Sequence, residues 1–338
     1  MNEKIEKKRI ELIDYLKAIC VTMVIFTHYD WSEKCTPLFT MFINMAVPVF
    51  MILSGYNFAM SGKKKANGKV VNMYKWNQIK PKLVRFLTPF VWICLIEIVL
   101  LIIEHKTINL PRIFLLGAYG PGSYYVPLMI QLLVIFPLIY YVVDKNAKLG
   151  LILSAGVNLA YEVFVEISGM EKYSYRLCIG RYILLIAFGC YLYLHPEKKL
   201  KTYQMVLMMM AGLSYIIFIV LQDRNISLFD YWTPTAMPVS FYIFPIVVIL
   251  FRLFYYSKIP GFLGTMLSKI GKASYHIFLV QMVYYHFELG GAIMKANPWI
   301  AVPFNILVCV PLGLWFCKID TEFIRKASIW KKQIRQMV

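Results

Sequence analysis

Three ionisable residues interrupt an otherwise apolar segment near the start of the chain: Asp14, Lys17 and His28. The segment runs from Ile10 to Tyr29 and would form about 30 Å of helix, the thickness of a bilayer core. Lys17 and His28 are eleven residues apart, so a helix places both on one stripe, about 16 Å apart along its axis. Asp14 lies one turn before Lys17. Charged groups inside a membrane span are costly, and this polar seam therefore predicts a functional interior sealed from lipid.

His28 is the candidate general base of a group-transfer reaction. A free imidazole has a pKa of about 6.5, so it gains and loses a proton near neutral pH. Transfer of an acyl group to a hydroxyl needs such a base, together with donors that stabilise the oxyanion. Asp30 or Glu33 could orient the ring, and the sequence identifies no oxyanion donor. The alternative is an uncleaved signal anchor whose lysine snorkels and whose His28 lies at the outer interface.

A second group of candidates lies at the end of the basic loop 61–85, which has no acidic residue after Gly62. The group consists of Lys80, Lys82 and Arg85, and two cations one turn apart at a helix start could hold phosphates. Coenzyme A carries several phosphates, so a donor site here is chemically sensible. The alternative is that the loop binds anionic lipid headgroups and fixes the orientation of the chain.

Five short motifs follow one another along the chain. They are Asp14-x-x-Lys17 with His28, Pro48 with Ser54-Gly55-Tyr56, Lys82-Leu-Val-Arg85 with Pro89, Tyr124 with Gln131 and Pro137, and Gly271-Lys272-x-Ser274-Tyr275. Together they resemble the integral-membrane acyltransferase 3 family, in which the histidine of the first helix is catalytic. Three positions depart from the family pattern. Phe278 stands where the family motif has a second tyrosine. Lys82 replaces an arginine and loses its planar bidentate geometry, and Gln281, where a histidine is common, cannot act as an acid or a base.

The resemblance implies an activity and its substrates. A member without an appended soluble domain would move an acyl group, most often acetyl, from cytoplasmic acyl-CoA to a hydroxyl of an extracytoplasmic glycan or another cell-envelope or lipid-linked acceptor. His28 would act as the base, directly or through an acyl-histidine, with Lys17 and Asp14 beside it. Acyl-CoA is then a co-substrate, and neither a bound cofactor nor a metal is expected. The implied location is a bacterial-type plasma membrane, with membrane lipids as partners.

Further polar residues could line a cavity or receive the acceptor. Asn158, Glu162 and Glu166 lie on one face at helical spacing, and Arg176 and Arg181 begin the next predicted span. An ion-pair network that closes this hairpin is the favoured interpretation, and an acceptor cleft is the alternative. The remaining candidates are Tyr124, Gln131, Ser274, Tyr275 and Gln281.

Composition and charge predict an all-α polytopic membrane protein, because 59% of the 338 residues are hydrophobic. Ten spans are predicted, at 10–29, 39–60, 86–104, 123–143, 149–168, 177–194, 204–221, 236–255, 270–289 and 299–317. With the N-terminus inside, cytoplasmic segments hold 27 of the 36 Lys and Arg residues and outer ones hold 8, which favours cytoplasmic N- and C-termini. A single domain over 1–338 is expected, with the basic loop 61–85 and a basic amphipathic tail at 318–338 on the cytoplasmic side.

Charge and cysteine content argue against other classes of protein. The net charge of +18 is clustered between apolar runs, which indicates membrane topology rather than nucleic-acid binding. The seven cysteines form no CxxC pair, so neither a disulfide framework nor a zinc site is predicted. The rival function is a carrier or exporter of a glycan or small polar solute, which the lack of paired repeats disfavours. The sequence leaves the acyl group, the acceptor and the oligomeric state open.

Overall fold

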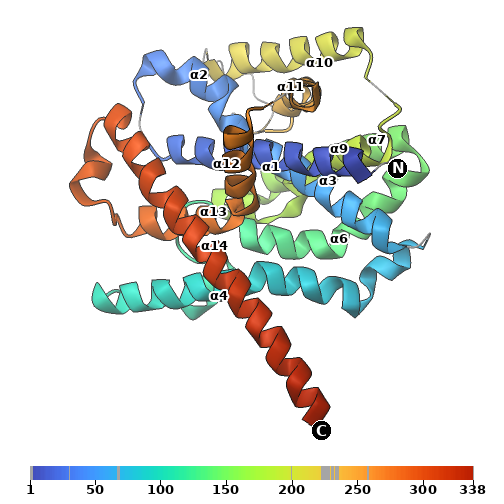
Figure 1. Cartoon of the computed structure of the whole chain (residues 1–338). Helices are drawn as coiled ribbons and strands as arrows, with labels where there is room; N and C mark the ends of the chain where they lie inside the picture. The colour runs from blue at the N-terminus through green and yellow to red at the C-terminus, as the bar shows by residue number, and fades with distance from the viewer. Residues whose placement is uncertain are drawn as a thin grey trace.

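The protein is a bundle of helices. The computed structural model describes residues 3–29, 31–66, 69–198, 200–221, 229, 232, 236–256 and 259–337. It is 84% helical, and the described residues form no strand. Figure 1 shows most of the longer helices side by side, with the C-terminal end of the last helix projecting from the bundle. The all-α prediction is confirmed.

The α-helices of the described residues come in the following order. They are α1 (Glu3–Phe26), α2 (Thr36–Met41), α3 (Ala46–Ala66), α4 (Trp76–Ile103), α5 (Leu110–Leu115), α6 (Tyr125–Lys145), α7 (Ala147–Ser168), α8 (Lys172–Leu177), α9 (Ile183–Leu194), α10 (Thr202–Tyr215), α11 (Val239–Tyr256), α12 (Gly261–Lys272), α13 (Ser274–His286) and α14 (Pro298–Met337). A 3-10 turn, Ile179–Tyr182, leads into α9, and a π-helical stretch, Ile216–Leu221, continues α10.

Five stretches are long and apolar enough to cross a membrane. They are Glu33–Lys64, Trp76–Ile103, Tyr125–Lys145, Ala147–Ser168 and Pro298–Trp330. Three shorter apolar helices accompany them, at Ile179–Leu194, Thr202–Phe218 and Val239–Tyr255. α1 is not among the five because Glu11, Asp14 and Lys17 lie within its apolar part. A membrane protein is supported, whereas the count of ten spans and the cytoplasmic termini stay predictions.

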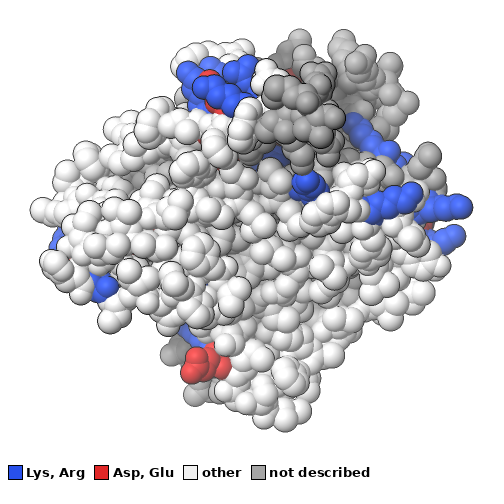
Figure 2. All heavy atoms as spheres, turned by 90° about the horizontal axis from the view of Figure 1, so that it is seen from below, with Lys and Arg blue, Asp and Glu red and all other residues white. Residues whose placement is uncertain are grey.

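The outer surface of the bundle is apolar where lipid would lie. Val91, Leu95 and Val99 of α4 are each more than two-fifths exposed, and α7 and α14 carry similar rows of exposed apolar side chains. Figure 2 shows a broad face that is almost free of charge, with Lys and Arg gathered towards its margins. Such a surface would be unstable in water but is the expected surface of a protein whose solvent is hydrocarbon.

Several boundaries differ from the sequence prediction. α4 begins at Trp76 rather than 86, the predicted span 39–60 is divided between α2 and α3, and three further differences bear on the site. α1 ends at Phe26 rather than Tyr29, the predicted span 270–289 is divided at Ala273 into α12 and α13, and α14 runs without a break from the last predicted span through the tail. At the end of α1, side chains satisfy the last carbonyls: the Thr27 hydroxyl donates to Val24 O at 2.7 Å, and the Trp31 indole donates to Phe26 O at 2.9 Å. These bonds complete the helix end, which the apolar pattern alone did not show.

α9 lies at the centre of the bundle, since all of its residues except Leu192 are buried. It packs against α3 through two glycines, one on each helix, and each glycine lies against the backbone of the other helix. A Cβ atom on Gly55 would overlap the carbonyl oxygen of Ile186, and one on Gly189 would overlap the carbonyl oxygen of Ile52. Small residues allow this close approach, which is a common basis of helix association in membranes.

We expect Gly189→Ala to destabilise the protein by about 2 kcal/mol, because the added methyl must push α3 and α9 apart. Gly156→Ala is the matched control, since a Cβ at this α7 position meets nothing within 4 Å and alanine favours the helix. Thermal unfolding in detergent micelles measures both variants. Equal midpoints for Gly189→Ala and Gly156→Ala would show that the contact between α3 and α9 is looser than described.

Candidate active site

A polar cavity of about 440 Å³ opens between α1, α3, α4, α12 and α13 and the start of α6. Five charged residues line it: Asp14, Lys17, Lys82, Arg85 and Lys272. With four cations and one carboxylate, its lining carries a formal charge of +3. An interior of this sign attracts anions, and phosphates above all where an arginine can bind them in a bidentate manner.

Helix periodicity explains how these charges meet. Lys82 and Arg85 lie nearly one turn apart on α4, and Asp14 and Lys17 have the same spacing on α1. Lys82 also lies 4.4 Å from the centre of the Phe58 ring, a cation–π contact that holds its ammonium over α3. The structure therefore brings these four predicted residues together at one cavity, and their roles stay predictions.

α12 completes the wall beside Asp14. The Ser268 hydroxyl donates to Asp14 Oδ2 at 3.5 Å, and a Cβ on Gly271 would overlap the Asp14 backbone carbonyl. Asp14 itself is 5% exposed. The glycine thus brings the end of α12 directly against α1, which places Lys272 at the cavity.

Tyrosines and hydroxyl groups form the opposite wall. Tyr124 and Tyr125 enter from the start of α6, and Ser274 and Tyr275 from the start of α13. The Tyr275 hydroxyl donates to the Phe86 carbonyl at 3.0 Å, which joins α13 to α4. Of these four residues, all but Tyr125 were predicted as cavity candidates, and the structure brings them together.

The loop that carries the two α6 tyrosines is anchored by a buried acid. Glu97 of α4 is fully buried, and its Oε2 accepts the Tyr119 N–H at 3.4 Å. The loop bends through left-handed backbone at Gly117, Ala118 and Gly122. Glu97, for which the sequence offered no partner, therefore holds the loop against α4.

His28 lies beyond the end of the cavity that Val24 and Phe278 line. It is in the turn after α1, half-buried, with its ring 4.2 Å from that of Tyr285 on α13. The nearest lining residues along these helices are Val24, four residues before His28, and Phe278, seven residues before Tyr285 on the same face of α13. The imidazole is thus one to two helical turns outward of the cavity. Asp30, the proposed orienting residue, lies outside the described residues, and Glu33 is exposed in the following 3-10 turn.

A second imidazole, for which the sequence analysis gave no role, lines the cavity. His276 of α13 donates from Nε2 to Asp320 Oδ2 of α14 at 3.0 Å. Both residues are buried, at 8% and 3% exposed, and His276 Nδ1 and Asp320 Oδ1 have no hydrogen-bond partner among the described residues. Phe316 packs edge-on against the His276 ring at 5.1 Å. This pair fixes α14 to the cavity wall.

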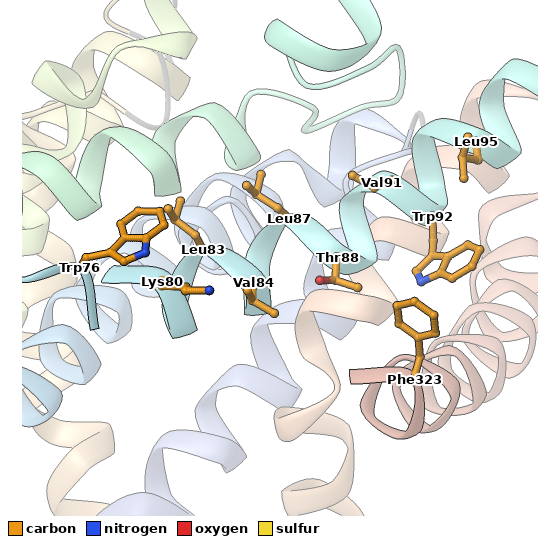
Figure 3. Close-up of a pocket in the computed structure, with 10 residues that line it drawn as sticks. All are labelled: Trp76, Lys80, Leu83, Val84, Leu87, Thr88, Val91, Trp92, Leu95 and Phe323. Carbon is orange, nitrogen blue, oxygen red and sulfur yellow. The ribbon is translucent and has the colours of Figure 1, made fainter. Parts of the chain in front are cut away.

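Lys80 does not belong to the donor group. It lines a separate groove on the outside of α4, together with apolar residues of that helix and Phe323 of α14 (Figure 3). Lys80 and Lys82 are two residues apart and so project about 200° apart around the helix. The prediction that Lys80 shares the site of Lys82 and Arg85 is therefore wrong, because Lys80 lines the groove and the other two residues line the polar cavity.

The two glutamines tie helices together rather than line the cavity. Gln131 donates to the Leu177 carbonyl at 2.7 Å and accepts the Ile179 N–H at 2.9 Å, so both ends of its amide hold the segment that leads into α9. Gln281 donates to the Val21 carbonyl at 3.2 Å and joins α13 to α1. Neither is among the lining residues, and their roles are structural.

The candidate acceptor cluster is a closed packing unit. Glu162 is 1% exposed and accepts the Tyr175 hydroxyl at 2.8 Å. The Arg181 guanidinium lies 4.5 Å from the Tyr175 ring centre and 5.3 Å from that of Tyr182. Arg176 is half-buried at the end of α8. Local closure of the hairpin is the better interpretation, with Tyr175 in contact with both the Glu162 carboxylate and the Arg181 guanidinium.

Three polar residues of α3 were missed by the sequence analysis: Ser54, Asn57 and Ser61 line the cavity. They recur every three to four residues, so helical spacing could have found them. The pairing of His276 with Asp320 had no such signal, because 44 residues separate them.

The side chains that could act as metal ligands do not form a metal centre in the part of the chain that the structure describes. Among the described residues, no group of three or more His, Cys, Asp or Glu side chains could hold an ion, and the seven cysteines are unpaired. What the cavity offers is positive charge, hydroxyl groups and the imidazole of His276, while the imidazole of His28 lies beyond its lining, against Tyr285.

Comparison with known proteins assigns the chain to a family. A family model described as an acyltransferase domain matches residues 10–318. No match was found among curated proteins, and none among solved structures. Because the matched region includes every residue of the polar cavity, the chain belongs to the acyltransferase 3 family of membrane acyltransferases.

Proposed function

We propose that the protein transfers an acyl group, acetyl being the simplest, from cytoplasmic acyl-CoA to a hydroxyl of an extracytoplasmic glycan or another cell-envelope acceptor. The observation that carries this proposal is the cationic cavity inside the helix bundle of an acyltransferase. Its volume of about 440 Å³ lies in the range of small-molecule sites.

The donor's phosphates would bind where the cations converge. Arg85 offers bidentate hydrogen bonds, while Lys17, Lys82 and Lys272 offer point charges around it. Towards α6 and α13 the lining becomes aromatic, with Tyr125 and Phe278 in contact at a ring distance of 5.4 Å. This gradient suits a ligand with a charged nucleotide end and a less polar arm that carries the acyl group.

His28 would act at the outer end of that arm. Its imidazole takes the proton of the acceptor hydroxyl while the hydroxyl oxygen attacks the thioester carbonyl. The carbon–sulfur bond then breaks, the thiolate leaves with the electron pair, and the imidazolium returns the proton to give the free thiol of coenzyme A. An acyl-histidine route splits the same change into two transfers, with the imidazole as the first nucleophile. In either route the acyl group passes Val24 and Phe278 to reach the ring.

The test of the donor site is Arg85→Ala. Loss of a charge-assisted, bidentate phosphate contact should raise the KM for acyl-CoA about tenfold or more while the KM for the acceptor changes little. Arg85→Lys should recover part of the loss, because it restores the charge without the planar geometry. Steady-state kinetics with labelled acetyl-CoA gives both constants.

Lys148→Ala is the control for a general effect of charge, since this lysine is exposed at the start of α7 and does not line the cavity. Equal shifts in the two KM values of Arg85→Ala would place Arg85 outside the donor site.

A further inference from the structure

α4 separates two unlike cavities. On one face it presents Lys82 and Arg85 to the polar cavity, and on the opposite face it lines a groove of about 560 Å³. Figure 3 shows the groove residues in a row along α4, with Phe323 reaching across from α14 towards Trp92. The two rings meet edge to face at 5.4 Å and close that end of the groove.

The groove is apolar with one cation at its start. The row on α4 recurs at helical spacing, as Lys80, Val84, Leu87, Val91 and Leu95. Lys80 is exposed and lies at the end of α4 that carries the basic loop, and the exposed indole of Trp76 lies one turn before it. Lysine and tryptophan at the edge of an apolar helix are typical of the membrane interface.

The length of the groove matches one leaflet. From Lys80 to Trp92 is 12 residues, or about 18 Å along the helix, close to half of a bilayer core about 30 Å thick. A groove of this length accepts one acyl chain that begins at the interface and ends near the middle of the membrane.

The walls are unsuited to a second helix. They consist of bulky side chains such as Trp76, Trp92 and Phe323. Helix pairs in membranes instead favour Gly, Ala and Ser, which let two backbones approach closely. A flexible chain can follow the spaces between large side chains, and the lysine complements an anionic headgroup.

We propose that this groove binds one anionic phospholipid of the leaflet on the basic side, with its phosphate at Lys80 and an acyl chain along Val84 to Trp92. The lipid braces α14 against α4 at Phe323. One turn before Phe323 lies Asp320, which His276 holds at the wall of the polar cavity. The bound lipid therefore supports the cavity from outside. This inference does not depend on the transfer reaction.

The test measures lipid retention by the intact protein. Wild type and variants are purified from nanodiscs of phosphatidylcholine with a minor share of phosphatidylglycerol, and native mass spectrometry counts the bound lipid. Lys80→Gln should weaken phosphatidylglycerol retention about fivefold, the effect of one lysine near an anionic headgroup. Val84→Trp, which fills the groove, should abolish retention and leave the protein folded, because Val84 is 36% exposed.

Two controls match these changes. Lys148→Gln removes an exposed cation elsewhere, and Val99→Trp enlarges a side chain of α4 outside the groove that is 54% exposed. Both should retain phosphatidylglycerol like wild type. Retention that is the same in all four variants overturns the proposal. So does a dimer in wild type that Val84→Trp alone converts to monomer, because a second copy would then occupy the groove.

Discussion

Replacing His28 with alanine should lower acyl transfer by about 10²- to 10⁴-fold, the usual contribution of a positioned general base. The binding of acyl-CoA should change little, because His28 lies outward of the cavity that holds Lys17, Lys82 and Arg85. Transfer of labelled acetyl groups from acetyl-CoA to envelope extract measures the rate, and equilibrium binding of the same donor measures affinity.

His105→Asn controls for the loss of an exposed imidazole, since His105 lies in a loop with left-handed backbone that asparagine tolerates. Full activity of His28→Ala would show that another residue acts as the general base. The first residue to examine would then be His276, the imidazole among the lining residues of the polar cavity.

Replacing Asp320 with alanine should destabilise the protein by about 3 kcal/mol, because it strands the buried His276 ring without its carboxylate. Replacing both residues with leucine should recover most of that loss, since an apolar pair of similar volume needs no partner. Thermal unfolding in nanodiscs compares the single variant with the double variant.

Glu322→Ala serves as the control, because Glu322 is exposed two residues further along α14. A double leucine variant that is no more stable than Asp320→Ala would show that the loss does not come from leaving the His276 ring without its carboxylate. The hydrogen bond that joins α14 to the cavity wall would then contribute little to the stability of the protein.

Helical spacing was enough to place the charged residues of α1 and α4 in pairs, and the structure brings both pairs to one cavity. Asp14 with Lys17 and Lys82 with Arg85 each lie about one turn apart, and this spacing can be read from the residue numbers once a helix is assumed. The same reasoning should have excluded Lys80, whose position two residues from Lys82 puts it on the other side of α4. The sequence analysis grouped Lys80 with Lys82 because they are close in the sequence, without considering the angle of about 200° between them on a helix.

Contacts between distant helices were beyond the sequence. Nothing local links His276 to Asp320, and the two halves of the pair are brought together by the packing of α13 on α14. The glutamines illustrate the converse error. Gln131 and Gln281 were candidates because of their positions in the family motifs, but their hydrogen bonds go to backbone carbonyl and N–H groups of neighbouring segments.

The end of α1 shows why the position of His28 needed a structure. An ideal helix through Tyr29 would put His28 on the stripe of Lys17, whereas α1 ends at Phe26 and the His28 ring packs at a tilt of 37° against that of Tyr285. Hydrogen bonds from the Thr27 and Trp31 side chains stabilise the end of α1 at Phe26, and the periodicity of apolar residues gives no sign of them. The fold class was predictable from composition, while the break at Ala273 between α12 and α13 was not.

The transfer of an acyl group across the bilayer is tested most directly in sealed vesicles that hold the protein in one orientation. Labelled acetyl-CoA is supplied on the side of the basic loop, and envelope acceptor is present only on the other side. The proposed mechanism predicts labelled ester on the acceptor, lost in His28→Ala and reduced in Arg85→Ala at low donor concentration. Passage of acceptor or other solute without label, unchanged in His28→Ala, would contradict it and indicate a carrier.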